Sequence, residues 1–237
     1  MCENCGCSDT ADHGHDHGHR HDLGVPAALS LNDRLAERNR GFCLAKRVSV
    51  VNLLSFSRSN AHALVERTVA EYGKRWRVAV IASADFEKLG ATHDHHHHGH
   101  FHDILPDQSA AVDAHAIGHA LSHLDLDRLD MVLIENGGSA ACQAVYDVGE
   151  TARVAVFSVR EGELKPLKFP WFFSDAPTVV INEINHAGVS GFDVVKARSN
   201  LKQVAPDAAV LELSPETGAG MDAWYALLDE LVKLNGK

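Results

Sequence analysis

Short runs of consecutive apolar residues alternate along this chain with longer amphipathic segments. The apolar runs are rich in Val, Ile and Leu, and they predict strands at 48–54, 77–83, 131–135, 152–159, 178–182 and 208–213. The amphipathic segments predict helices at 61–74, 109–124, 192–204 and 221–234, and an earlier helix through Leu35 and Leu44 with Asn32 as its cap. Such strands, separated by helices, are typical of a parallel sheet covered on both faces. We therefore predict an α/β fold.

Residues 29–237 form the predicted domain, and residues 1–28 form a polar tail of Cys, His, Gly and Asp. We expect the tail to be disordered without metal, because it has too few apolar residues to form a core. The stretch 87–106 shows no helix or strand pattern and contains a histidine-rich insertion at 93–102. A loop of this length is usually functional or disordered.

The formal net charge of -10 argues against nucleic acid as a partner, because binding a phosphate backbone needs clustered Lys and Arg. It suits the binding of cations instead. The sequence has no apolar run of the roughly 18 residues that span a membrane, and its start lacks a signal peptide. We therefore expect a cytoplasmic protein without a membrane partner. In that reducing compartment, five cysteines indicate metal or reactive thiols rather than disulfides.

Three thiols lie within six residues at the start of the chain, at Cys2, Cys5 and Cys7. The Cys-x-x-Cys-x-Cys spacing lets the sulfurs converge on one ion. Thiolates together with main-chain nitrogens suit a square-planar Ni(II) site, whereas Zn(II) prefers tetrahedral ligation. The alternative is an incidental group of thiols on a mobile end.

Two histidine tracts add imidazole ligands. They comprise His13, His15, His17, His19 and His21 in the tail, and His93, His95, His96, His97, His98, His100 and His102 in the insertion. Most of these side chains should be neutral near pH 7, because an unperturbed histidine has a pKa of about 6.5. Such tracts bind several ions weakly and exchangeably, which suits metal buffering or transfer. A solvated linker or a purification tag is the alternative.

Three further histidines, His115, His119 and His123, recur every four residues and should line one face of a helix. Imidazoles at this spacing can chelate a metal, although such a row is more often a polar face. Cys142 follows a strand end, where it is either a site residue or a buried thiol. Cys43 lies in an amphipathic helix and is interpreted as a packing residue.

The segment from Ser55 to His62 follows a buried strand and precedes a helix. In this context GxxxxGK[ST] binds the phosphates of a nucleotide, yet the segment contains neither glycine nor lysine. Ligands of parallel sheets bind beyond the carboxyl ends of the strands. Polar residues at these ends are Ser55, Ser83, Glu135 and Asn182.

Nearly the whole chain resembles the HypB family, GTPases that assist nickel insertion into [NiFe]-hydrogenases. The likeness rests on residues 2–7 with the histidine-rich tail, and on the segments 134–136, 147–150, 165–170 and 214–224. It implies a P-loop NTPase-like fold of the SIMIBI type and nickel, with zinc as an alternative, as the bound metal. It also implies hydrogenase maturation factors and the hydrogenase large subunit as partners. The family dimerises in a nucleotide-dependent way, so a homodimer, or pairing with an active relative, is left open.

The chain departs from the family at its nucleotide-binding positions. The family's loop would place glycine at Arg58 and Asn60, lysine at Ala61 and threonine at His62. Its guanine-reading NKxD motif corresponds to Asn182-Glu183-Ile184-Asn185, in which Asn185 replaces the carboxylate. The segment 80–85 also departs from the family's pattern. These losses predict that GTP hydrolysis is lost, so no catalytic residue is assigned and they argue against GTP and Mg²⁺ as cofactors.

The family's metal site in the GTPase domain is altered as well. Its adjacent Cys-His pair corresponds to Ala110-Ala111, whereas a further Cys matches Cys142 and a further His matches His115. The insertion at 93–102 is a candidate substitute for the missing pair. The preferred interpretation is a nickel store or chaperone for hydrogenase maturation. The alternatives are a divergent GTPase with slow turnover, and a pseudo-GTPase that pairs with another maturation factor.

Overall fold

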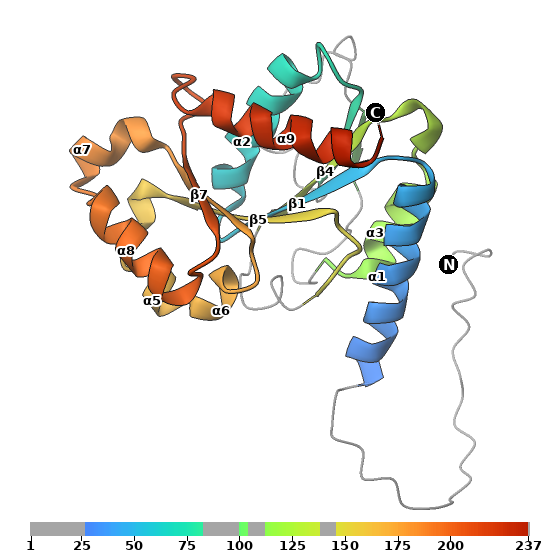
Figure 1. The fold of residues 1–237 in the computed structure, drawn as a ribbon, viewed down its shortest axis with the longest axis horizontal. Coiled ribbons are helices and arrows are strands. Elements are labelled where there is room, and N and C mark those ends of the chain that lie inside the picture. Colours follow the sequence, from blue (N-terminus) through green and yellow to red (C-terminus); the bar gives the residue numbers. More distant parts are fainter. Residues whose placement is uncertain (1–26, 83–99, 104–111, 138–145, 237) are drawn as a thin grey trace, which may run out of the picture.

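The computed structural model describes residues 27–82, 100–103, 112–137 and 146–236. Within these residues, seven strands form one sheet in the order β3-β2-β4-β1-β5-β6-β7 (Figure 1). Every neighbouring pair is parallel. The strands are β1 (Ser49–Ser55), β2 (Val78–Ala82), β3 (His100–Asp103), β4 (Met131–Gly137), β5 (Ala152–Ser158), β6 (Thr178–Asn182) and β7 (Ala209–Glu212). The predicted α/β fold with a parallel sheet is confirmed.

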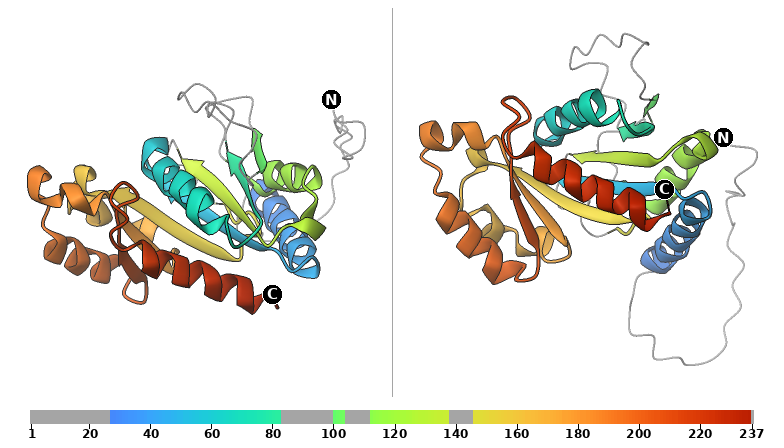
Figure 2. Two further views of the ribbon diagram at one scale, coloured as in Figure 1. Left: turned by 90° about the horizontal axis from the view of Figure 1, so that it is seen from above. Right: turned by 45° about the horizontal axis from the view of Figure 1, so that its top comes forward.

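Helices cover both faces of the sheet, which makes three layers (Figure 2). On one face lie α2 (Arg58–Tyr72) and α9 (Met221–Leu234). The opposite face is covered by α1 (Ala27–Ala45), α3 (Ala114–Ser122), α6 (Pro170–Phe173) and α8 (Val194–Val204). Two further short helices are α5 (Lys165–Lys168) and α7 (Ala187–Ser190).

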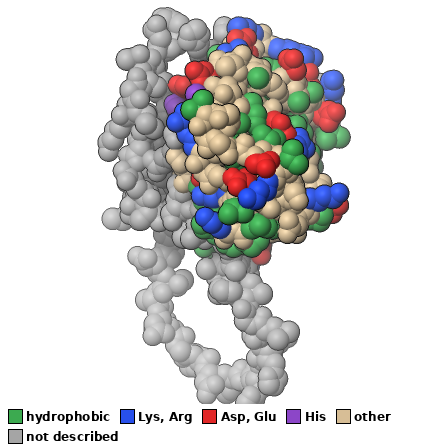
Figure 3. All heavy atoms as spheres, turned by 90° about the vertical axis from the view of Figure 1, so that its left-hand side faces the viewer, with side chains coloured by type: hydrophobic (Ala, Val, Ile, Leu, Met, Phe, Trp, Pro, Cys, Tyr) green, Lys and Arg blue, Asp and Glu red, His purple; other side chains and the backbone are tan. Residues whose placement is uncertain are grey.

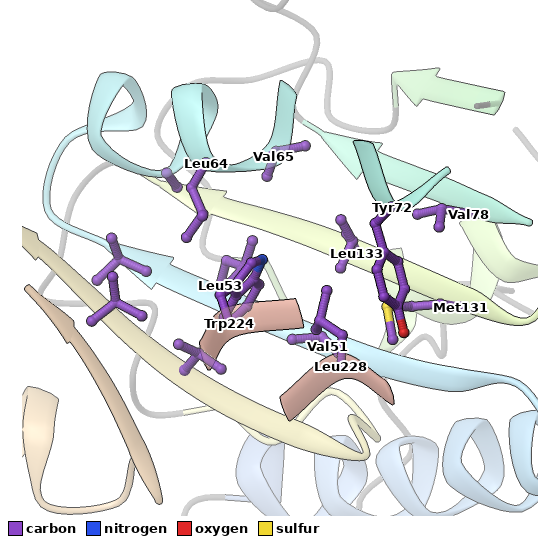
Figure 4. Close-up of a cluster of buried hydrophobic side chains, with 14 of the residues drawn as sticks. Val51, Leu53, Leu64, Val65, Tyr72, Val78, Met131, Leu133, Trp224 and Leu228 are labelled. Carbon is purple, nitrogen blue, oxygen red and sulfur yellow. The ribbon is translucent and has the colours of Figure 1, made fainter. Parts of the chain in front are cut away.

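The core follows the period of two that a strand imposes. Val51 and Leu53 of β1 point toward α2 and α9, whereas Val50 belongs to the cluster under α1 and α3. Trp224 of α9 is fully buried against Leu53 in the first cluster (Figure 4). Its indole Nε1 donates a hydrogen bond to the Thr68 hydroxyl of α2 at 2.9 Å. The buried ring therefore also satisfies its polar atom.

Helix α1 docks onto the domain through two buried asparagines. Asn32 donates to the carbonyl of Asp147 at 2.7 Å and accepts from the amide of Ala114 at 2.9 Å. Asn39 donates to the carbonyls of Ala114 at 2.7 Å and Val148 at 3.1 Å. The predicted role of Asn32 as a helix cap is wrong, because α1 begins at Ala27 and Asn32 lies inside it.

Glycine is required where the chain passes closest to α1. Gly149 has a φ of 89°, and a Cβ there would lie 2.5 Å from the carbonyl oxygen of Ala36. The segment 147–150, one of the segments that resemble the HypB family, thus forms part of the surface on which α1 packs.

The structure corrects two predicted helix starts and one stretch that was predicted to lack regular structure. Helix α2 begins at Arg58, three residues before its predicted start at Ala61. Helix α3 begins at Ala114 rather than at 109, because Asp113 caps it by accepting from the amide of Ala116 at 2.8 Å. The stretch 87–106 was predicted to lack regular structure, but His100–Asp103 pairs with β2 as the edge strand β3.

In the described part of the chain, no helix combines the length and apolar character needed to cross a membrane. Figure 3 shows the face that carries α7 and α8, and on it acidic and basic side chains are interspersed with apolar ones.

Candidate functional site at the carboxyl ends of the strands

The connection between β1 and α2 is very short. Strand β1 ends at Ser55 and α2 begins at Arg58, so only Phe56 and Ser57 lie between them. The Ser55 hydroxyl donates to the carbonyl of Ser57 at 2.9 Å, which closes this turn. Ser57 occupies the N-cap position, but its side chain makes no capping hydrogen bond. Positions 58–60, predicted as loop, are therefore helical.

Two nucleotide-loop positions point into the domain at the start of α2. Ala61 is fully buried in the core under α2, and His62 has a side chain that is 14% exposed. His62 Nδ1 lies 3.5 Å from Oε2 of Glu135, and its Nε2 lies 3.3 Å from Oε1 of Glu66. Glu135 stands near the carboxyl end of β4, beside β1, with only 5% of its side chain exposed. The carboxylate of Glu135 raises the pKa of His62, and Glu66 adds to the effect.

An aromatic cluster fills the space beside the β1 end. The ring of Phe56 lies 4.1 Å from Phe172 and 4.9 Å from Phe169, measured between centroids. The ammonium of Lys165 stands 3.7 Å from the centroid of Phe56, and it pairs with Glu161 at 2.9 Å. The residue that follows β1 is thus fixed by packing and by a cation on its face.

The segment after β6 is held by its own neighbours. Asn182 accepts from the amide of Glu183 at 2.8 Å, and Glu183 has a φ of 59°, which is unusual for a residue other than glycine. The carboxylate of Glu183 accepts from the Ser158 hydroxyl and lies 3.3 Å from Arg160 Nε.

The carboxylate of Glu216, in the loop before α9, contacts the segment that follows β6. Asn185 Nδ2 donates to Glu216 Oε2 at 2.9 Å, and His186 Nε2 lies 3.2 Å from the same oxygen. The loop itself turns through Gly218 and Gly220, which both have positive φ, and a Cβ at Gly220 would overlap the carbonyl oxygen of Glu212.

Most of the predicted metal ligands lie outside the described residues. These are Cys2, Cys5, Cys7, His13, His15, His17, His19, His21, His93, His95, His96, His97, His98 and Cys142. His100 and His102 fall on the edge strand β3. Among the residues that the structure describes, no group of three His, Cys, Asp or Glu side chains is placed to hold a metal ion.

The histidine row on α3 is exposed. His115 and His119 lie on α3, and His123 is the residue that ends it. The rings of His119 and His123 have centroids 4.7 Å apart. The row therefore does not supply a three-residue metal site within the described chain, and the role of His115 beside Cys142 stays a prediction. Cys43 is buried among apolar side chains, as predicted, and this burial raises the pKa of its thiol to about 12.

Sequence reasoning missed the carboxylates Glu66 and Glu216 as partners of His62 and Asn185. It also missed the pairing of Glu183 with Ser158 and Arg160. Glu66 could have been found from its spacing of four residues after His62 on a predicted helix. Glu183 and Glu216 depend on contacts across the fold, and their pairing leaves no signal in the local sequence.

Comparison with known proteins places this scaffold. No protein-family model matches the chain. The probable hydrogenase maturation factor HypB of Methanocaldococcus jannaschii is 31% identical over 205 residues, which cover 86% of this chain and 93% of that protein. The chain belongs to the HypB family of hydrogenase maturation factors. HypB of Azotobacter vinelandii is 34% identical over 85% of this chain and 66% of that protein. HypB of Escherichia coli K12 is 33% identical over 85% of this chain and 69% of its own length.

Solved structures agree with this assignment. HypB from Archaeoglobus fulgidus matches with a TM-score of 0.76 and 30% identity, over 86% of this chain and all of that chain. HypB from Helicobacter pylori, solved in complex with nickel, matches with a TM-score of 0.77 at 23% identity, over 86% of this chain and 96% of that chain. FtsY from Mycoplasma mycoides matches with a TM-score of 0.50 and 12% identity, over 77% of this chain and 68% of that chain. The last two likenesses concern the fold, which is the P-loop fold of the SIMIBI type.

Proposed function

We propose that this chain is a nickel-binding accessory protein for [NiFe]-hydrogenase maturation, a metal store or chaperone on the HypB fold without efficient GTP hydrolysis. The observation that carries the proposal is the junction between β1 and α2. A phosphate loop wraps its backbone N–H groups around the phosphates before the helix starts. Here two residues connect Ser55 to a helix that already begins at Arg58. Too little chain is left between strand and helix to wrap a triphosphate.

The side chains at the junction support the same conclusion. The family's lysine position is Ala61, which is fully buried and carries no charge for the β- and γ-phosphates. The hydroxyl that would hold Mg²⁺ is replaced by His62, a poor ligand for a hard cation, and its ring faces Glu135. Each charge-assisted hydrogen bond that is lost costs roughly 1.5–3 kcal/mol, so several losses together remove most of the affinity.

The guanine-reading segment, residues 182–185, has also lost groups that would bind the nucleotide. An aspartate would accept from two donors of guanine, but the Asn185 amide has one acceptor oxygen, and its nitrogen is bound to Glu216. Glu183 stands at the position of the motif's lysine and is engaged with Ser158 and Arg160. Because this site and the phosphate site have both changed, a simple adjustment of nucleotide affinity explains the pattern poorly.

The nickel half of the proposal rests on donor chemistry and on a relative. HypB from Helicobacter pylori has been solved in complex with nickel. In this chain the thiols of Cys2, Cys5 and Cys7 would form the tight site, and the two histidine tracts would form an exchangeable reservoir. Zn(II) is the competing ion, since thiolate and imidazole bind both metals.

The test is a pair of titrations on one metal-free sample, with Ni(II) in one cell and Mg-GTP in the other. We expect more than one Ni(II) per chain and no saturable binding of Mg-GTP. Replacing the histidines of both tracts by asparagine should lower the nickel capacity and leave a tight site. Replacing Cys2, Cys5 and Cys7 by serine should remove the tight site and leave the capacity of the tracts. Equal stoichiometry in all three proteins would refute this division.

The proposed setting is the cytoplasm, with hydrogenase maturation factors and the hydrogenase large subunit as partners. A homodimer, or a pair with an active relative, is compatible with a metal-carrying role. Co-purification of tagged protein from cells that assemble hydrogenase distinguishes these arrangements. A complex with a complete GTPase would favour the pair, and a complex with itself the homodimer.

A further inference from the structure

A buried carboxylate lies where a P-loop NTPase would keep its metal ion. In those proteins a hydroxyl at the start of the helix and an acidic side chain on another strand hold Mg²⁺. Here Glu135, with 5% of its side chain exposed, stands near the end of β4, and the start of α2 presents His62. A carboxylate buried to this degree needs a counter-charge, because desolvation strongly disfavours an isolated ion.

The ring of His62 has a carboxylate on each side. Its Nδ1 lies 3.5 Å from Glu135 Oε2, and its Nε2 lies 3.3 Å from Glu66 Oε1. A neutral imidazole has one N–H donor and one bare nitrogen, so one of the two carboxylates would face a lone pair. Only the doubly protonated ring presents a donor to both. The two distances are those of ion pairs rather than of short hydrogen bonds.

We propose that the His62 imidazolium is a built-in cation that occupies the metal position of the P-loop fold and clasps α2 to Glu135. The clasp joins residues 73 positions apart in the sequence. It gives the buried carboxylate a counter-charge from the chain itself, so the start of α2 is held on β4 without Mg²⁺ or nucleotide. The inference deepens the proposed function. It rests on that function, because it interprets this site as a former metal position.

The surroundings of His62 favour the charged ring. Among the strands packed on α2, β1 and β2 carry no titratable side chain, and β5 carries Arg153, which pairs with Glu150 at 2.7 Å. On α2 itself, Glu66 lies one turn after His62 and favours its charged form, whereas Arg58, one turn before His62, is a residue of like charge. The hydrogen bond to Glu135 is the largest cause of a raised pKa of His62; burial opposes it and Glu66 assists.

A raised histidine pKa gives the clasp a defined pH dependence. Its stabilisation is fully present below the pKa of the unfolded state, about 6.5, and is lost as the pH rises through the folded-state pKa of His62. The start of α2 should therefore loosen as the pH rises through this raised pKa.

The experiment is a proton NMR titration of the histidine Cε1–H signals in the full-length chain, kept metal-free with a chelator. His62→Asn identifies the signal among those of the 17 histidines. We expect His62 in the wild type to titrate above 6.5. Glu135→Gln should lower that pKa most, and Glu66→Gln should lower it less. Glu71→Gln removes an exposed carboxylate of the same helix, which pairs with Lys74, and should leave His62 unchanged.

A wild-type His62 that titrates at or below 6.5 would overturn the clasp, and so would a shift that survives Glu135→Gln. If Glu135→Gln fails to fold, the wild-type titration alone decides. The outcome is separate from that of the proposed function. Binding of Mg-GTP by the wild type would contradict the loss of nucleotide chemistry, whereas the position of the His62 titration in the nucleotide-free chain tests only the clasp.

Discussion

Asn39→Ala should destabilise the domain by releasing α1, the helix that connects the Cys/His-rich tail to the sheet. The Asn39 side chain is 3% exposed and donates to two carbonyls, those of Ala114 and Val148. Alanine at this position keeps the helix but leaves both carbonyl oxygens buried without their donor. The cost is therefore one of unmet hydrogen bonds rather than of helix propensity, since alanine is the best helix former.

The magnitude follows from the two bonds. A net contribution of about 0.5–1.5 kcal/mol for each hydrogen bond, with a further penalty for acceptors left buried, gives a loss of about 2–3 kcal/mol in the free energy of unfolding. For a domain of this size, each kcal/mol lowers the melting temperature by roughly 2–4 °C. Asn39→Ala should thus melt about 4–12 °C below the wild type.

Thermal unfolding followed by far-UV circular dichroism, with urea unfolding as a second measurement, checks this value. Gln203→Ala is the matched control, because it removes an exposed amide of α8 that donates to the carbonyl of Ser199 at 3.3 Å. That change should stay within about 0.5 kcal/mol of the wild type. If Asn39→Ala stays within the same margin, the hydrogen bonds of Asn39 do not hold α1 on the domain. The interpretation of the segment 147–150 as a packing surface for α1 would then be wrong.

Two further predictions concern the helices on the other face. Gly220→Ala should lower the free energy of unfolding more than Gly162→Ala. Both glycines have positive φ, but of the two only Gly220 has a backbone carbonyl where a Cβ would lie. Urea unfolding of the two variants tests this difference. The second prediction concerns Asp229, whose pKa is lowered. Burial raises this pKa, but the hydrogen bonds that Trp76 and Tyr72 donate to the carboxylate outweigh burial. Its stabilisation is therefore present above pH 4 and lost as the pH falls through the lowered pKa, so Asp229→Asn should be less stable than the wild type at pH 7, and the difference should shrink in acid.

Where local pattern decides an element, the sequence predicted it closely. Strand β6 and helix α9 were predicted at their observed bounds, 178–182 and 221–234. Both elements have a clear start signal in the sequence, since Pro177 precedes β6 and Gly220 precedes α9. The apolar period of α9 is also strong, because it buries Trp224 and Leu228 along one face.

Elements with a weak or misleading local pattern were missed. Strand β3 has the sequence His100-Phe101-His102-Asp103, which carries no apolar run, and it exists because its backbone pairs with β2. The start of α2 was placed too late because the likeness to a phosphate loop suggested an irregular segment. Without glycine at Arg58 and Asn60, the segment lacks the residues that give a phosphate loop its backbone freedom.

The clustering of polar residues at the strand ends was predicted, but their side-chain contacts were not. The carboxyl ends of β1, β4 and β6 bring Ser55, Glu135 and Asn182 to one edge of the sheet, as parallel topology requires. The facing of His62 and Glu135 depends on the exact register of α2 over β4, which sequence periodicity does not supply. The buried hydrogen bonds of Asn32 could not be predicted either, because their partners, Ala114 and Asp147, are far away in the sequence.

The most direct test of the central claim is calorimetric titration of Mg-GTP into the metal-free, full-length chain. The account predicts no saturable binding up to millimolar nucleotide, because the β1–α2 junction has neither the loop nor the lysine that triphosphate needs. Saturation at one Mg-GTP per chain with micromolar affinity would contradict it.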